Sequence, residues 1–396
     1  MEKHRTLILG LTVALCWFSL YAYLPILPAY ARQLGASYEM VGMIVGAYGF
    51  TQMALRLPLG VMSDKLNARK VFVVIGLALC VVSSAGMWLV PSVGSLLIFR
   101  SLAGVAATTY VVQTILFASY YAEANSAQAM GNVQASATAG QMVATLIAGY
   151  LALRFGEEYT FLLAAAGGLV GFLLSLAIAE KARVARAPVK LMDMLAVVKE
   201  RSLLVASGLE MVLQMVTYST AYGFVTLVAK NIGANNFELG LLPTLFMLPG
   251  TFASAVSGTF FAAKFGMRLS TVMGLVLLAG PVFLIPLVSD LYALYATQVV
   301  AGFGRGLAFP LLMESSLRGV AREKRATAMG YFQSIYGLGM FVGPLIVGVL
   351  GDRWGLDWGF WAIGLIGLAG AAGAAFLLPW AERTEAAAIN SCRACR

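Results

Sequence analysis

The stretch GVMSDKLNARKVFVVIG, residues 60–76, places a compact, mostly basic hairpin between two apolar runs. Its charged residues are Asp64, Lys65, Arg69 and Lys70. A related stretch, GTFFAAKFGMRLSTVMG, occupies residues 258–274, which begin 198 positions further along the chain. The recurrence indicates that the chain contains two related halves.

Two further pairs of segments keep nearly the same offset. MGNVQ at 130–134 matches MGYFQ at 329–333. RSLAG at 100–104 corresponds to QVVAG at 298–302, with polar residues (Arg100 and Gln298) at the first position and glycine at the last. Matches in the same order and register predict a duplicated six-helix unit. Repeats of this kind build many secondary transporters, whose substrate site lies near the bilayer midplane between the halves.

Composition indicates what each half is made of. Of the 396 residues, 60% are hydrophobic and 11% are charged, whereas soluble domains carry roughly 25% charged residues. A membrane-crossing helix needs about 20 apolar residues, and such runs recur along nearly the whole chain. We therefore expect an all-α integral membrane protein with twelve transmembrane helices in two pseudo-symmetric six-helix bundles. The expected spans are 6–31, 38–63, 70–90, 93–121, 126–153, 159–180, 202–229, 237–262, 270–288, 291–316, 326–351 and 358–380. The longest polar break divides the chain into an N-terminal bundle (1–180), a cytoplasmic linker (181–201) and a C-terminal bundle with a short cytoplasmic tail (202–396).

The positive charge is distributed asymmetrically. With a cytoplasmic N-terminus, 20 of the 27 Lys and Arg residues fall on the cytoplasmic side and only four on the opposite side. This bias follows the positive-inside rule, so the net charge of +9 reports topology and not nucleic-acid binding. We expect a multi-pass protein of the plasma (inner) membrane with both termini cytoplasmic. It should be a monomer whose partners are the lipid bilayer and a small-molecule substrate.

These features together resemble the major facilitator superfamily over the full chain. The hairpin at 60–70 is similar to the family's signature between helices two and three, although Asn67 and Ala68 replace its usual glycine and arginine. The residues that fit, and that the resemblance implies act as a conformational latch at the cytoplasmic face, are Gly60, Asp64, Lys65 and Arg69. Arg100 with Gly104 resembles the family's fourth-helix motif, which implies that Arg100 assists proton movement.

Two segments look like the twelve-helix drug and metabolite exporters of that family: LPILPAY at 24–30 and LRLPLGVMSD at 55–64. The exporters' fifth-helix antiporter motif ends in Gly-Pro, but residues 144–145 are Ala-Thr here. A Gly-Pro pair occurs instead at 343–344, in the eleventh span. Export in exchange for protons is therefore the first hypothesis, and proton-coupled uptake stays open as the alternative.

Ionisable groups inside a membrane cost about 2.5–3.5 kcal/mol or more at the bilayer centre, so each needs a function or a partner. The five candidates are Arg56, Arg100, Glu210, Arg305 and Glu314. Glu210 lies roughly 13 Å into the seventh span, near the midplane. Gln214 and Tyr218 follow it at helical spacing and extend one polar stripe. Glu210 can carry the coupling proton or hold a cationic group; the alternative is a structural pair with Arg305.

Arg305 shares a helical face with Gln298 and can hold a carboxylate or phosphate through two parallel hydrogen bonds. Glu314 lies near the cytoplasmic end of the same span, where a salt bridge to Lys264 or Arg268 is favoured over substrate contact. Arg100 and Arg56 each have a plainer alternative. For Arg100 it is a hydrogen bond to nearby carbonyls, and for Arg56 it is snorkelling to the cytoplasmic interface.

In the first span, Thr12, Cys16, Ser19 and Tyr23 form a polar stripe at helical spacing, which predicts a cavity wall without an acid. Three arginines against two carboxylates make the interior positive, which favours anionic or zwitterionic solutes over cations. The single histidine and the isolated Cys392–Cys395 pair predict no catalytic site, no metal site and no cofactor besides the proton. No Walker lysine motif is present, so ATP-driven transport is disfavoured.

The sequence therefore predicts a secondary active transporter that works by alternating access and exports a small amphipathic, anionic or zwitterionic solute in exchange for protons. Uptake of a small solute, lipid flipping and a non-transporting membrane sensor remain the alternatives.

Overall fold

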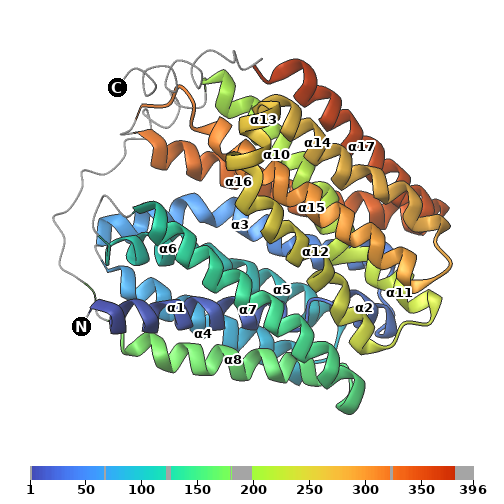
Figure 1. The fold of residues 1–396 in the computed structure, drawn as a ribbon. Coiled ribbons are helices and arrows are strands. Elements are labelled where there is room, and N and C mark those ends of the chain that lie inside the picture. Colours follow the sequence, from blue (N-terminus) through green and yellow to red (C-terminus); the bar gives the residue numbers. More distant parts are fainter. Residues whose placement is uncertain are drawn as a thin grey trace.

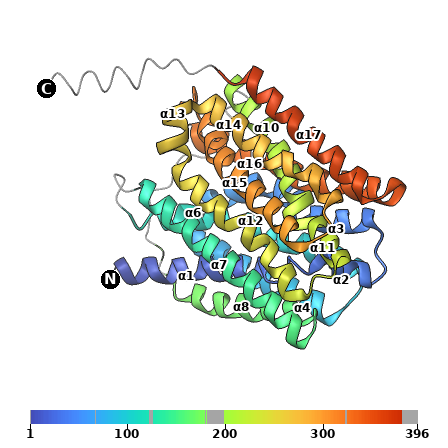
Figure 2. The same cartoon turned by 45° about the vertical axis from the view of Figure 1, so that its right-hand side comes forward.

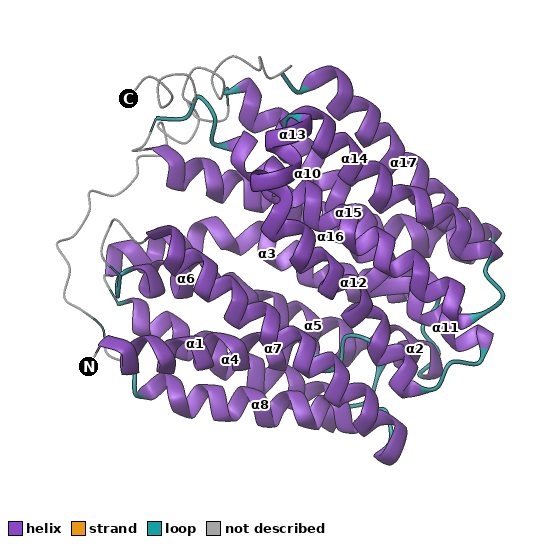
Figure 3. Cartoon of the chain, viewed as in Figure 1, coloured by secondary structure: helices purple, strands orange, loops and turns teal. Residues whose placement is uncertain are grey.

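The computed structural model describes residues 2–66, 68–121, 126–178, 180, 199–321 and 324–379. Over these residues the chain is helical and has no strand (Figure 3). The helices of the first half are α1 (Glu2–Tyr21), α2 (Leu27–Gln33), α3 (Tyr38–Leu66), α4 (Arg69–Leu89), α5 (Val93–Thr108), α6 (Tyr110–Ala118), α7 (Ser126–Phe155) and α8 (Tyr159–Leu176). Those of the second half are α10 (Arg201–Ser219), η2 (Thr220–Phe224), α11 (Val225–Ile232), α12 (Asn236–Val256), η3 (Ser257–Ala262), α13 (Ala263–Phe265), α14 (Met267–Ala279), η4 (Gly280–Leu287), α15 (Leu291–Ser316), α16 (Arg325–Trp354) and α17 (Leu356–Leu377).

Each expected span corresponds to one helix or to a run of consecutive helices. Nine helices of the described chain are long and apolar enough to cross a membrane. The first expected span is interrupted, because α1 ends at Tyr21 and α2 begins only at Leu27. Two prolines, Pro25 and Pro28, lie in and just after this break, and each lacks the amide hydrogen that a continuous helix would use at its position. The greater part of the expected linker, 181–198, and the tail from 380 lie outside the described residues.

The seventh span also departs from a regular helix. Between α10 and α11 it passes through one π-helical turn, Thr220–Phe224, where Gly223 has non-helical backbone angles (φ −129°, ψ −108°). π-turns inside α-helices are rare and occur frequently at functional sites. The turn begins two residues after Tyr218, the last residue of the polar stripe on α10.

The helices form two bundles that pack against each other along two helix pairs (Figures 1 and 2). In the first pair, α3 packs on α16, and Gly42 and Gly46 let the backbones approach, since a Cβ on either glycine would meet the backbone of α16. In the second pair, α7 packs on α12, where the hydroxyl groups of Thr145 and Thr244 lie 3.0 Å apart. Small residues at such crossings are typical of membrane helix packing.

The two bundles meet at one end and diverge toward the other. We call the face that carries the N-terminus the inner face, because the charge distribution predicts it to be cytoplasmic, and the opposite one the outer face. Toward the outer face, α2 of the first half contacts α11 of the second, whereas α6 and α16 lie apart toward the inner face (Figure 1). Exposed polar side chains on the inner part of α7, Asn132 and Gln134, fit a water-filled opening there. The two halves are therefore in contact toward the outer face, and their helices lie apart toward the inner face (Figure 1).

Candidate transport site

Glu210 and Gln214 lie on one face of α10 and are both buried. The Nε2 group of Gln214 donates to Oε1 of Glu210 at 2.7 Å. The second carboxylate oxygen, Glu210 Oε2, and Gln214 Oε1 have no hydrogen-bond partner. Buried polar atoms in folded proteins are nearly always paired, so these two oxygens mark a place that a proton, water or ligand can occupy.

Arg305 of α15 lies close enough to Glu210 to act on it electrostatically, but the two side chains form no ion pair within 4.0 Å. The guanidinium carbon lies 5.4 Å from the centre of the Phe309 ring, and its Nε has no hydrogen-bond partner. The alternative of a structural pair between Glu210 and Arg305 is therefore not realised as a direct contact. Both groups retain unused bonding capacity on facing helices.

Arg100 of α5 is buried with 1% of its surface exposed. Its Nη1 donates to the hydroxyl of Tyr23 at 3.0 Å and, more weakly, to the carbonyl of Leu20 at 3.5 Å. The guanidinium also lies 4.2 Å from the centre of the Tyr48 ring, and Tyr48 stacks on Tyr218 of the other half with centroids 6.2 Å apart. The carbonyl bond that we considered as the plainer alternative is present, and the tyrosines connect Arg100 to the second half.

Arg56 of α3 differs from the expectation. Its side chain is 2% exposed and donates to the hydroxyl of Tyr336 on α16, so it does not reach toward the cytoplasmic interface. The prediction that Arg56 snorkels to the cytoplasmic interface was wrong, because the neighbouring half covers this part of α3. Arg56 instead bridges the two halves, at the inner end of the contacts that join α3 to α16.

The remaining candidates on α15 lie in different surroundings. Gln298 is buried, its Nε2 donates to Oγ1 of Thr297 at 3.2 Å, and its Oε1 has no partner. Glu314 is exposed and pairs with Arg318 one turn further on, at 3.3 Å, not with Lys264 or Arg268. Its salt bridge is thus made within its own helix end, which the sequence alone could not separate from a loop contact.

The polar stripe of the first helix does not line the opening. Cys16 lies 3.8 Å from Cys80 of α4, sulfur to sulfur, inside the first half. The side of α1 that meets the second half carries Tyr21, whose ring centre lies 5.6 Å from that of Tyr222. Trp17, one turn earlier, packs on Tyr110. The four-residue spacing of Trp17 and Tyr21 was the one feature of the sequence that could have placed them on this side of α1. Aromatic residues at helical spacing are equally common in ordinary cores, however, so the spacing does not identify such a face.

The described residues cover only part of the expected latch. The side chains of Gly60, Asp64 and Lys65 lie outside the described part of α3, as do Cys392 and Cys395 of the tail. The backbone amide of Arg69 donates to Oε1 of Glu180 at 2.8 Å, and that of Lys70 to Oε2 at 3.2 Å. The start of α4 is thus capped from the end of the sixth span.

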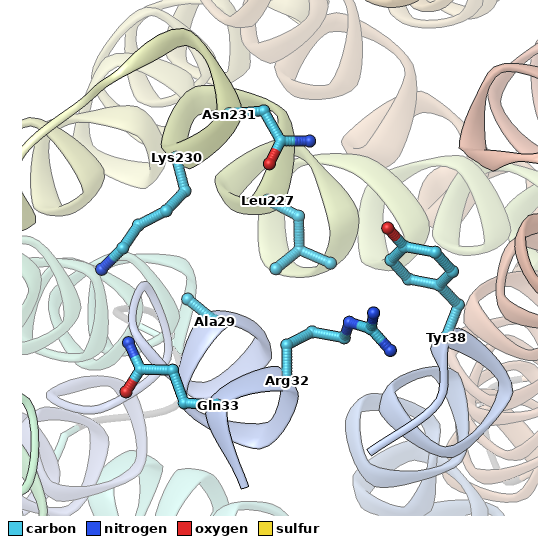
Figure 4. A pocket seen from close by; sticks show the side chains of 7 residues that line it. All are labelled: Ala29, Arg32, Gln33, Tyr38, Leu227, Lys230 and Asn231. Carbon is cyan, nitrogen blue, oxygen red and sulfur yellow. The ribbon is translucent and has the colours of Figure 1, made fainter. Parts of the chain in front are cut away.

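Polar contacts between the halves close the outer face. A cavity of about 320 Å³ lies there (Figure 4). It is lined by Ala29, Arg32, Gln33, Tyr38, Leu227, Lys230 and Asn231. Lys230 of α11 pairs at 2.5 Å with Glu157, which also accepts from Gln33 of α2 at 3.1 Å.

Within the described ranges, no group of three His, Cys, Asp or Glu residues is placed to hold a metal ion.

The sequence model of the Major Facilitator Superfamily matches residues 9–215 and 207–391. The chain belongs to this superfamily. It is therefore a multi-pass membrane transporter and not an enzyme. Its superfamily relatives include the uncharacterised transporter YceJ of Bacillus subtilis, 27% identical over 82% of this chain and 84% of the relative. They also include the quinolone resistance protein NorA of Staphylococcus aureus, 24% identical over 87% of this chain and 89% of the relative.

Solved structures of other superfamily transporters have the same fold. A bacterial homologue of the human lysosomal transporter Spinster, in an inward-facing and unoccupied conformation, superposes with a TM-score of 0.81 over 95% of this chain and 96% of that one, at 15% identity. The nucleoside transporter NupG superposes with a TM-score of 0.75 over 95% and 99% of the two chains, also at 15% identity. At this level of identity the likeness concerns the fold.

Proposed function

We propose that this transporter exports a small amphipathic zwitterion in exchange for protons, by alternating access between its two halves. It would act as a monomer in the plasma membrane with both termini cytoplasmic, and the hairpin at 60–70 would be its inner latch. The observation that carries the proposal is the arrangement of Glu210 and Arg305. They are opposite charges on adjacent helices, near each other but not in contact, and each has an atom without a hydrogen-bond partner.

Glu210 gives the site its coupling chemistry. An ionised carboxylate at this depth is costly unless a positive charge or a proton neutralises it. A cationic group of the solute and a proton would compete for the same Oε2 atom, because one carboxylate cannot satisfy both. Because of this competition, a proton that binds Glu210 from one side of the membrane displaces the solute to that side. Solute and proton therefore cross the membrane in opposite directions.

Arg305 supplies the complementary half of the site. Its planar guanidinium matches a carboxylate or phosphate in bidentate geometry. A zwitterion that bridges Arg305 and Glu210 would satisfy both without bringing the two residues together. Tyr218 and Tyr222, whose ring centres lie 5.2 Å apart on the same span, provide aromatic surface for the apolar part of the solute.

Export is favoured by the names of two relatives. NorA is a quinolone resistance protein, and PmrA of Streptococcus pneumoniae, 28% identical over 37% of each chain, is a multi-drug resistance efflux pump. A solute that carries only a negative charge would behave differently. Protonation of Glu210 would then free Arg305 for the anion, so proton and solute would move together and drive uptake.

Inside-out membrane vesicles with an imposed pH gradient, acidic inside, test the proposal. Zwitterionic, anionic and cationic amphiphiles are first screened by thermal shift on the purified protein, and those that bind are added to the vesicles. Exchange predicts that a zwitterion collapses the pH gradient, and that Glu210→Gln abolishes the effect while Glu314→Gln, an exposed carboxylate on α15, retains it. Solute flux that is insensitive to pH, or that survives unchanged in Glu210→Gln, would remove the proton from the mechanism.

A further inference from the structure

The N-terminus of α3 is capped by a residue of the other half. One carboxylate oxygen of Asp352, at the outer end of α16, accepts from the amide of Tyr38 at 2.9 Å, and the other accepts from the amide of Glu39 at 2.7 Å. The first amides of a helix have no partner within it, and a negative charge there is favoured by the helix dipole. Asp352 thus serves α3 as a cap that is supplied from a residue 314 positions away in sequence.

The helix's own residues do not replace this cap. Ser37, directly before α3, accepts a hydrogen bond from the amide of Met40 at 3.1 Å and so satisfies only one of the first amides. Gly348 of α16 faces the backbone of Tyr38 and Glu39, where an added Cβ would clash. This close approach brings the Asp352 carboxylate to the two amides that Ser37 does not reach. If the halves separate on the outer face, both amides and the carboxylate must turn to water.

The same helix pair has a matching arrangement of aspartates along its length. The two helices run in opposite directions, since α3 goes from the outer to the inner face and α16 returns. Each carries an aspartate in its last turns, Asp64 on α3 and Asp352 on α16, on the face where the other helix begins. The sequence draws attention to Asp64 through the hairpin at 60–70, but nothing in its pattern marks Asp352.

We propose that Asp352 is a conformational lock of the outer face: its ionised carboxylate holds the N-terminus of α3 in the inward-open state and releases it when the outer face opens. The lock rests on the alternating access proposed above, but not on proton coupling or on any solute. Lys230 with Glu157 and Gln33 closes the outer face on the side of α2 and α11. Asp352 adds a second polar contact between the halves at the outer face, between α3 and α16.

Pulsed electron paramagnetic resonance on the full-length protein in nanodiscs tests the lock. Spin labels are placed at Pro91 and Ser289, exposed residues of outer loops in the first and second halves, after the tail cysteines are changed to serine. Asp352→Asn keeps the size of the side chain and removes its charge. A charge at a helix end that also accepts two amide bonds contributes on the order of 1–2 kcal/mol, so the outward-open population should rise about 5- to 30-fold relative to the inward-open one.

The control is Asp357→Asn, which removes the same charge from the first turn of α17, a helix that packs on α14 and α16 within the second half. A second label pair at Gln128 and Leu269, exposed near the inner face, should report the opposite change, namely closure. A shift in Asp352→Asn that is absent from Asp357→Asn supports the lock. No shift, or equal shifts in both variants, overturns it. Because the readout is a distance distribution, failure of proton-coupled export in the vesicle assay would leave this result unaffected.

Discussion

Replacement of Glu210 by glutamine should remove the binding contribution of the solute's positive charge and leave that of its negative charge. Glutamine is nearly isosteric with glutamate. Its side-chain oxygen can still accept the hydrogen bond that Gln214 Nε2 donates to Glu210 Oε1 at 2.7 Å in the wild type, so α10 should remain folded. What changes is the charge offered at the free oxygen. A cation about 3 Å from a carboxylate gains roughly 5 kcal/mol at an effective dielectric constant of 20, before its desolvation is subtracted.

Hydrogen bonds to charged groups contribute about 1.5–3 kcal/mol net, against 0.5–1.5 for neutral ones. We therefore expect Glu210→Gln to weaken binding of a zwitterion by about 1–2 kcal/mol, which corresponds to a 5- to 30-fold increase in Kd. An analogue whose amino group is acetylated lacks the cation and should bind the variant at least as well as the wild type. In the variant, Arg305 no longer has a nearby carboxylate competing for it.

Isothermal titration calorimetry at several pH values measures both effects. In the wild type, the zwitterion should bind more tightly as pH rises, because protons compete with its cation for Glu210 and are removed. In Glu210→Gln this slope should vanish, since no titrating carboxylate remains at the site. If the variant binds the zwitterion within two-fold of the wild type and keeps the pH slope, Glu210 is not the coupling group.

Three further predictions concern the scaffold. Arg100→Lys loses the planar cation over the Tyr48 ring, now 4.2 Å away, and should lower stability by about 1–2 kcal/mol in thermal unfolding of the detergent-purified protein. Gly302→Ala places a methyl group against the backbone of α12 and should lower stability by about 1–3 kcal/mol. Its control is Gly208→Ala, whose methyl group would meet nothing within 4 Å, so stability should be unchanged or slightly higher. Glu314→Gln breaks only an exposed pair one helical turn long and should change stability by less than about 0.5 kcal/mol; a loss above 1 kcal/mol would show that this carboxylate has a structural partner beyond Arg318.

The helical spans could be predicted because the length of an apolar run is a local property of the sequence. For α3, the expected start at residue 38 agrees with the structure, and the helix extends three residues beyond the expected end at 63. The breaks were harder to predict. The interruption after Tyr21 coincides with two prolines, but α12, α15 and α16 continue through prolines of their own. The π-turn at Thr220–Phe224 has no comparable signal in the sequence.

Helix orientation limited the prediction of the site. Hydrophobic periodicity locates a polar face but does not say which neighbour covers it, since a bundle interior and a water-filled opening both accept Cys and Ser. The stripe with Cys16 was therefore assigned to the opening, although it packs on α4. The partners of Arg56 and Asp352 escaped prediction for the same reason. Tyr336 and the start of α3 are 280 and 314 residues away from them in sequence.

The buried arginines differ in what holds them, and this difference bears on substrate charge. Arg56 and Arg100 form no ion pair within the described chain and are held by tyrosine hydroxyls and rings, which stabilise a cation without neutralising it. Among the carboxylates whose side chains the structure describes, Glu210 lies near Arg305. The centre of the protein therefore keeps a positive potential even when Glu210 is ionised, and a proton on Glu210 makes it more positive. A solute without a negative group would meet this potential in every protonation state, which is why the geometry favours a zwitterion or anion over a simple cation.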